Sequence, residues 1–234
     1  MKTPFITLLF FAIAAGSSSQ DCSKYAQFKQ GCVITTTSYN EKDKVQGFSK
    51  SKCLSVAANG AGITANMRSE SFDKNGKDQS STDFTMTCRN GIVLFDIKMM
   101  IPSQSTSQYE NMEMKIEGDN LEFPSSLSAG QKLKDGKATI TFTSPGSPVN
   151  ISMQVNITNR KVEAKEALTT PAGTYECYKI TYDIETLTNV MGMNMSVKGK
   201  EIQWYNMEIN AVKTQNYDKD GKMLGYSLVT EIKK

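Results

Sequence analysis

The 234-residue sequence contains no histidine. Without an imidazole the chain cannot build a Ser-His-Asp or Cys-His nucleophile, and most catalytic sites for transition metals lose a usual ligand. A hydrolase would have to use paired carboxylates, or serine with lysine, and no such pairing is apparent from the sequence. We therefore expect a protein that is not an enzyme and that carries no cofactor and no metal.

Dense positive charge is also lacking. The formal net charge is +3, and the lysines and arginines are scattered, with no run of five or more. A nucleic-acid backbone requires concentrated positive charge, so we expect no nucleic-acid partner. Beyond the N-terminal segment, no apolar stretch approaches the roughly 20 residues that cross a bilayer, and we expect no membrane-spanning segment.

The N-terminal segment has the order of a secretory signal. Lys2 precedes an unbroken apolar run over residues 5–15, and the small residues Gly16 to Ser19 follow it. This order is typical of a cleaved signal peptide, so we predict a signal peptide at 1–19 and a mature chain at 20–234. Cys22 follows Asp21 rather than a small residue, which argues against a lipid anchor. The expected location is the periplasm or the cell surface.

Five cysteines in an exported chain predict disulfides, because that compartment is oxidising. Five is an odd number, so at most two bridges form within the chain, and about 15 arrangements of two pairs are open. If residues 40–45 close a hairpin, counting outward along the two strands places Cys32 near Cys53. These two are the disulfide candidates.

Turns and alternation indicate the fold class. Residues 39–44, 72–77 and 217–222 share an aromatic residue followed by Asn or Asp and lysines, a composition that suits tight hairpin turns. Apolar and polar residues alternate over 149–157, which is typical of a strand buried on one face. We predict a mainly β protein with a single curved antiparallel sheet or half-barrel, built as a β-meander.

The predicted organisation is one β-rich domain over 20–234, with halves at 22–100 and 119–234. The polar stretch between these halves interrupts the strand pattern. Within it, residues 109–116 fit either a short helix or another strand.

Methionine is abundant, with thirteen residues, and Met191, Met193 and Met195 would share one face of a strand. Thioethers are good ligands for Cu(I), and flexible methionine surfaces also suit an adaptable apolar cavity. Ordinary core packing is the third reading and the most favoured of the three, and copper is the least favoured because no histidine or cysteine accompanies the cluster. Together with Trp204, these methionines are the candidate ligand-binding residues.

Three stretches resemble the TapB-like family of exported bacterial domains of unknown function. They are TPAGTYECYKI at 170–180, LEFPSSL with GQKLKDG at 121–136, and WY to YDKDGK over 204–222. The resemblance implies a curved antiparallel sheet similar to the half-barrels of lipoprotein carriers. It implies no known activity and no catalytic residue. The chain departs from the family pattern at 207–210, where MEIN replaces small residues.

The function expected from these features is non-enzymatic. We expect an exported binding or accessory protein that takes a lipid, another apolar ligand or an envelope protein partner on a concave face. The alternatives are a structural component of the envelope and an enzyme that uses carboxylates.

Overall fold

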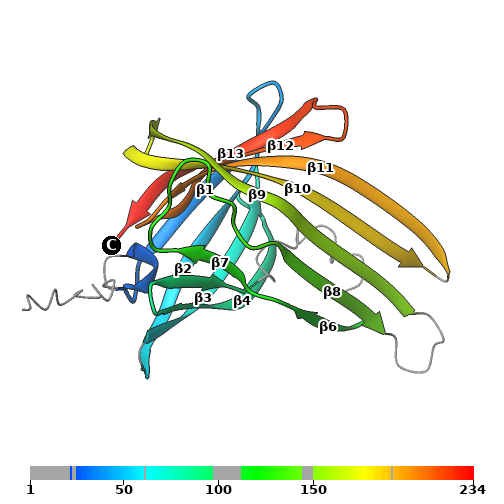
Figure 1. Cartoon of the computed structure of the whole chain (residues 1–234), viewed down its shortest axis with the longest axis horizontal. Coiled ribbons are helices and arrows are strands. Elements are labelled where there is room, and N and C mark those ends of the chain that lie inside the picture. The colour runs from blue at the N-terminus through cyan, green and yellow to red at the C-terminus, as the bar shows by residue number, and fades with distance from the viewer. Residues whose placement is uncertain (1–21, 23–24, 61, 97–111, 144–149, 191) are drawn as a thin grey trace, which may run out of the picture.

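The computed structural model describes residues 22, 25–60, 62–96, 112–143, 150–190 and 192–234. Within them the chain forms one antiparallel sheet of thirteen strands, together with the short 3-10 helix η2 (Figure 1). The predicted mainly β fold with a single curved antiparallel sheet is confirmed. The predicted signal peptide at 1–19 lies outside the described residues.

The elements, in chain order, are η2 (Ala26–Phe28), β1 (Val33–Asn40), β2 (Val45–Asn59), β3 (Gly62–Asp73), β4 (Asp78–Arg89), β5 (Ile92–Phe95), β6 (Glu113–Gly118), β7 (Leu121–Pro124), β8 (Gly136–Thr143), β9 (Asn150–Thr170), β10 (Gly173–Val190), β11 (Met193–Asn206), β12 (Asn210–Asp218) and β13 (Met223–Lys233). The stretch left open between helix and strand, residues 109–116, contributes a strand where it is described, because β6 begins at Glu113.

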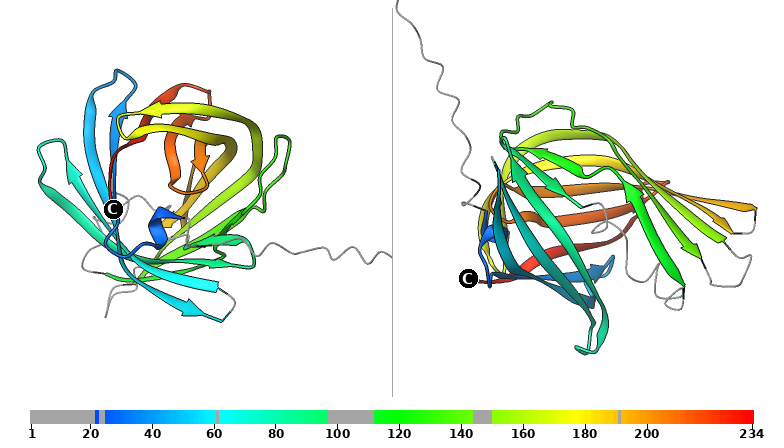
Figure 2. Two further views of the ribbon diagram at one scale, coloured as in Figure 1. Left: turned by 90° about the vertical axis from the view of Figure 1, so that its left-hand side faces the viewer. Right: turned by 90° about the horizontal axis from the view of Figure 1, so that it is seen from below.

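The sheet is curved, and its two edge strands are neighbours in the sequence. The strand order is β6-β8-β9-β10-β11-β12-β13-β1-β2-β3-β4-β5-β7, so β6 and β7 are the edges. Only Asp119 and Asn120 separate these two strands in sequence. The first and last described strands, β1 and β13, pair in the middle of the sheet. Figure 2 shows the sheet curving around η2, and the sheet is not closed into a barrel.

The three predicted turns share one hydrogen-bond arrangement. At the β1–β2 turn the Asn40 side-chain oxygen accepts the backbone N–H groups of Lys42 and Lys44, both at 3.0 Å. Asp73 and Asp218 accept the equivalent pairs of N–H groups at the β3–β4 and β12–β13 turns. Each side chain therefore replaces a missing backbone partner in its loop. The hairpins predicted at these three places are confirmed.

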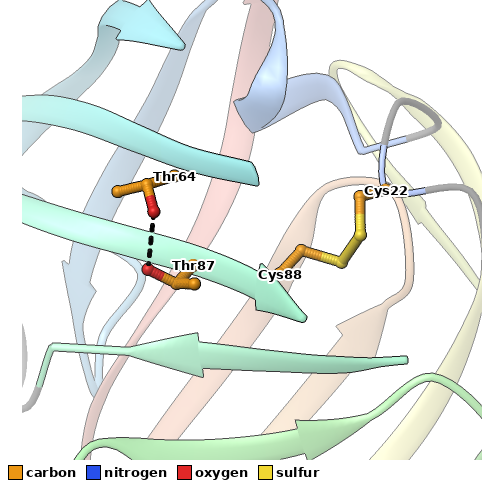
Figure 3. Close-up of a disulfide and its surroundings, with 4 residues drawn as sticks. All are labelled: Cys22, Thr64, Thr87 and Cys88. Carbon is orange, nitrogen blue, oxygen red and sulfur yellow. Dashed lines mark hydrogen bonds between the residues drawn. A yellow bond between two sulfur atoms is a disulfide. The ribbon is translucent and has the colours of Figure 1, made fainter. Parts of the chain in front are cut away.

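A disulfide joins the start of the described chain to the sheet. Cys22 is bonded to Cys88 on β4 (Figure 3). Beside it, β3 and β4 are linked by a 3.2 Å hydrogen bond between the hydroxyls of Thr64 and Thr87. The bridge thus ties the segment before η2 to one half of the sheet.

The predicted Cys32–Cys53 disulfide is not formed in the structure. The two residues are neighbours across β1 and β2, as counting from the turn predicts, because the Cys53 N–H donates to the Cys32 carbonyl at 3.0 Å. Both side chains nevertheless stay as buried free thiols, as does Cys177. Burial raises the pKa of all three thiols, and for Cys177 the nearby Glu176 and Glu166 contribute to a value of about 11.

Candidate functional site

The predicted ligand-binding residues fall in two separate places. On β11, Met193 is 68% exposed and Met195 is 56% exposed. The β10–β11 register runs without a shift from Met193 to Tyr205, so residues of odd and even number point to opposite faces. Trp204 therefore lies on the other face from the two methionines, and the structure does not bring them together. Met191 lies outside the described residues.

Trp204 is buried in a structural cluster. Its indole N–H donates to the Glu166 carboxylate at 2.5 Å. The ammonium groups of Lys179 and Lys213 lie 5.4 and 5.1 Å from its ring. These partners satisfy both the polar and the aromatic part of the indole, so Trp204 is held by interactions within the protein.

The candidate site is instead a cavity of about 250 Å³ inside the curve of the sheet. At ~30 Å³ per molecule this volume corresponds to about eight waters, so it suits a small ligand. Strands from both halves of the chain line the cavity. Its buried apolar surface consists of six side chains: Ile34, Phe95, Leu121, Phe123, Ile157 and Ile209.

A wall of hydroxyl groups faces this apolar surface. Thr36, Ser49, Ser51 and Ser69 from β1, β2 and β3 line the cavity and are all half-buried. The apolar residues are fully buried, so the hydroxyl wall is the part of the lining nearer to solvent. This combination of an apolar floor and a few polar groups is typical of small-molecule sites.

Arg160 reaches the cavity because of a bulge in β9. Asp183 pairs with Thr158 and Thr181 pairs with Lys161, so two residues of β9, Asn159 and Arg160, lie opposite the single residue Tyr182. Asn159 adopts a φ of 56°, which asparagine tolerates better than most residues. An extra residue in one strand changes the direction of the side chains beside it, and here Arg160 lines the interior.

The guanidinium of Arg160 is held rigidly. It is 2% exposed, and Nη1 donates to the carbonyl of Lys134 at 2.5 Å and to that of Glu122, on the edge strand β7, at 3.2 Å. The guanidinium lies 4.7 Å from the centre of the Phe123 ring, which stacks in turn on Tyr205 with ring centres 4.6 Å apart. Arg160 thus connects β9 to the edge strand β7.

The charge on Arg160 has no carboxylate partner. None of the ion pairs between described residues includes it, and its Nη2 atom is buried without a hydrogen-bond partner. Burial lowers the pKa of Arg160, although a guanidinium stays charged in proteins. An unpaired buried charge costs several kcal/mol, so this arrangement is unusual for a purely structural arginine.

Other polar atoms of the lining also lack partners. Among the described residues, the buried atoms without hydrogen bonds include Gln203 Oε1, the Tyr205 hydroxyl and Asn210 Oδ1, and all three residues line the cavity. The orientation of Asn210 is fixed, because its Nδ2 donates to Gln27, whose own Nε2 donates to the Ile209 carbonyl at 2.9 Å. Buried polar groups normally have partners, so this concentration around one cavity singles it out.

Tyr182 and Glu201 form a hydrogen-bonded pair beside the cavity. The Tyr182 hydroxyl donates to the Glu201 carboxylate at 2.5 Å. Burial raises the pKa of Glu201, while its hydrogen bond from Tyr182 acts in the opposite direction. Burial, followed by the charge of Glu201, raises the pKa of Tyr182 well above its usual value. Burial therefore disfavours the charged form of both groups, and none of the ion pairs between described residues joins Glu201 to Arg160.

A larger groove of about 650 Å³ lies where β10, β11 and the β12–β13 turn meet. Its lining carries charges of both signs, and several of them are already engaged. Glu185 pairs with Lys198 at 3.2 Å, and Asp183 accepts a hydrogen bond from Asn159. Among the described residues, none of the buried polar atoms without a hydrogen-bond partner belongs to this groove, so the interior cavity is the stronger candidate site.

Sequence reasoning missed this cavity because its residues come from strands far apart in the chain. The one local signal was the Asn159-Arg160 pair, which interrupts the alternation that precedes it.

Within the described part of the chain, no helix is long and apolar enough to cross a membrane. No group of three or more His, Cys, Asp or Glu side chains in the same residues could hold a metal ion.

The chain is similar to a known protein family and to two solved structures. A family profile described as DUF3108-like matches residues 29–229. A crystal structure from Parabacteroides distasonis, of a predicted lipoprotein, has a TM-score of 0.75 at 22% identity and covers 92% of this chain and 100% of its own. A second crystal structure, of a predicted exported protein with a YmcC-like fold from Bacteroides fragilis, has a TM-score of 0.71 at 20% identity, covering 88% and 97%. No curated protein matches the chain.

Proposed function

The chain belongs to the DUF3108-like family, and we propose that this member is an exported, non-catalytic protein that binds a small amphipathic molecule in its interior cavity. The observation that carries the proposal is the composition of that cavity. A buried apolar floor lies opposite half-buried hydroxyl groups and beside several unpartnered polar atoms. Binding would satisfy these atoms while it removes apolar ligand surface from water.

Export is supported by three observations of different kinds. The N-terminal sequence has the order of a signal peptide. The two structural neighbours are described as a predicted exported protein and a predicted lipoprotein, and the chain contains a disulfide, which suits an oxidising compartment. The resemblance to TapB-like domains and the cleavage of residues 1–19 stay predictions, and N-terminal sequencing of the mature protein tests the cleavage.

Native mass spectrometry of the protein purified without detergent tests the binding proposal. We expect an additional mass that denaturation releases, and we expect the Ser69→Phe variant to lose it, because the new ring fills the cavity from β3. Thr85→Phe is the matched control. Thr85 lies on β4 between the buried residues Phe84 and Met86, so its side chain points away from the core.

A bare polypeptide that also fails to bind hydrophobic fluorescent probes would contradict the proposal. The methionine surface is tested separately with Met193→Asp. This residue is exposed and does not line the cavity, so loss of the bound molecule in this variant alone would move the site to Met193 and Met195, as the sequence predicted. The same spectra report bound copper, the other reading of the methionines.

A further inference from the structure

We propose that the cavity recognises its ligand by an anionic group, a carboxylate or a phosphate, that binds Arg160. This inference rests on the proposed binding function and adds the chemical class of the ligand. It starts from the unpartnered Nη2 atom on a side chain that is only 2% exposed. An anion is the partner that a buried guanidinium binds most strongly, because the hydrogen bonds are charge-assisted.

The structural role of Arg160 does not account for its charge. The carbonyls of Glu122 and Lys134 take two hydrogen bonds, both from Nη1. A neutral amide such as glutamine carries two N–H donors of its own, so joining β9 to these carbonyls does not require a cation. The guanidinium adds a buried charge and a second, unused nitrogen, and both are explained if an anion occupies the cavity.

The site around Arg160 is built to hold a fixed geometry. The carbonyl bonds and the contact with Phe123 restrain the guanidinium, and Phe123 is itself stacked on Tyr205. The Tyr205 hydroxyl is buried, unpartnered and free to donate, and Tyr205 lines the same cavity. Both donors belong to residues that line one cavity and are restrained by these contacts, so binding an acid group there costs little side-chain entropy.

The remaining lining restricts the rest of the ligand. Gln203 Oε1 and Asn210 Oδ1 are unpartnered acceptors, and they favour a ligand that also carries a hydroxyl or amine donor. The apolar body would lie against residues such as Phe95, Leu121 and Ile157. At about 250 Å³ the cavity is smaller than the roughly 300–1,000 Å³ typical of drug-sized sites, so the ligand, or the part that enters, is short.

Isothermal titration calorimetry with three eight-carbon probes tests the inference. Octanoate carries a carboxylate, octyl phosphate a phosphate, and octanol the same chain without a charge. We expect one or both anions to bind at least tenfold more tightly than octanol, and the tighter of the two identifies the acid group. The affinity for the anions should fall only slightly as the salt concentration is raised, because a buried ion pair is poorly screened.

Two variants assign the recognition to the proposed groups. Tyr205→Phe removes only a hydroxyl that has no partner, so it should fold as the wild type does and bind the anions about tenfold more weakly. Arg160→Lys keeps the positive charge but loses the planar pair of guanidinium nitrogens that can bind two oxygens at once. It should reduce the affinity for the anions by about tenfold or more and leave the affinity for octanol unchanged. Arg68→Lys is the control, since Arg68 pairs with Asp83 on the exposed side of β3 and β4.

The outcomes separate this inference from the function on which it rests. If octanol binds as tightly as the anions, and Tyr205→Phe leaves all three affinities unchanged, the cavity binds ligands but the anion inference is wrong. If none of the three probes binds and the natively purified protein carries no ligand, both proposals fail. Circular dichroism of each variant establishes whether it is folded. If Arg160→Lys does not fold, the affinities of Tyr205→Phe decide the test.

Discussion

Glu201 is a carboxyl group whose environment opposes its charge. Burial raises its pKa above the value of an unfolded chain, so folding favours the protonated form. The stability that this preference gives is complete below the unfolded pKa of about 4.3 and is lost as the pH rises through the folded pKa. We therefore expect Glu201→Gln to raise the free energy of unfolding at pH 7 and to leave it unchanged near pH 4. Urea denaturation at both pH values measures this difference.

Glu185→Gln provides a control with the opposite sign. Its hydrogen bond with Lys198 lowers the pKa of the half-buried Glu185, so its ionised form stabilises the fold above the unfolded pKa. The glutamine variant should be no more stable than the wild type at pH 7. Equal pH dependence in the two variants would contradict the assignment of Glu201 as a buried acid. The hydrogen bond from Tyr182 is kept in Glu201→Gln, because the amide oxygen still accepts it.

Single residues were the hardest feature to predict from the sequence. Counting from a turn correctly made Cys32 and Cys53 neighbours, but adjacency of two backbones does not decide whether two sulfur atoms bond. Met193 and Trp204 were grouped by chemical type, although strand parity places them on opposite faces. Arg160 carried no motif, and its importance arises only from residues that meet it in space, Glu122 and Phe123 on β7 and Lys134 just before β8.

Turns are the elements whose structure is encoded most locally. Asn40→Ala removes the oxygen that accepts two backbone N–H groups in the β1–β2 loop. We expect a loss of about 1 kcal/mol in the free energy of unfolding, because these groups must then bond to water in an ordered loop. Asn40→Asp should keep most of the stability. Glu41→Ala in the same loop is the control and should change stability by less than about 0.5 kcal/mol; an equal loss in both would refute the turn mechanism.

The length and curvature of the strands exceeded what alternation could predict. The pattern at 149–157 correctly indicated a strand, but β9 continues to Thr170. Its alternation is interrupted by register shifts opposite Thr181–Asp183 and Lys179–Ile180, and a bulge changes the face on which each later residue lies. Sequence periodicity therefore ends where the strand bends, which is also where Arg160 is directed inward.

At the scale of the whole molecule, the two predicted halves contribute to one sheet. Strand β13 of the second half pairs with β1 of the first, and β5 of the first pairs with β7 of the second. Such pairings join residues up to about 200 positions apart, and no local signal specifies them. The cavity depends on these long-range pairings, since its lining draws on β1 to β3 as well as on β9 to β12.

The Cys22–Cys88 disulfide restrains this assembly over a sequence separation of 66 residues. Closing a loop of that length reduces the entropy of the unfolded chain, and we expect the double variant Cys22→Ala/Cys88→Ala to lose about 2–4 kcal/mol of stability. Guanidinium denaturation measures the loss, and reducing agent should lower the stability of the wild type to nearly that of the variant.

Cys177→Ala is the control. Cys177 is a free thiol, so this variant keeps the Cys22–Cys88 disulfide, and reducing agent should lower its free energy of unfolding as it does for the wild type. Thiol counting in denaturant gives an independent check: three reactive thiols support the bonding described here, whereas one would show that a second bridge forms, and peptide mapping would then test whether it joins Cys32 to Cys53.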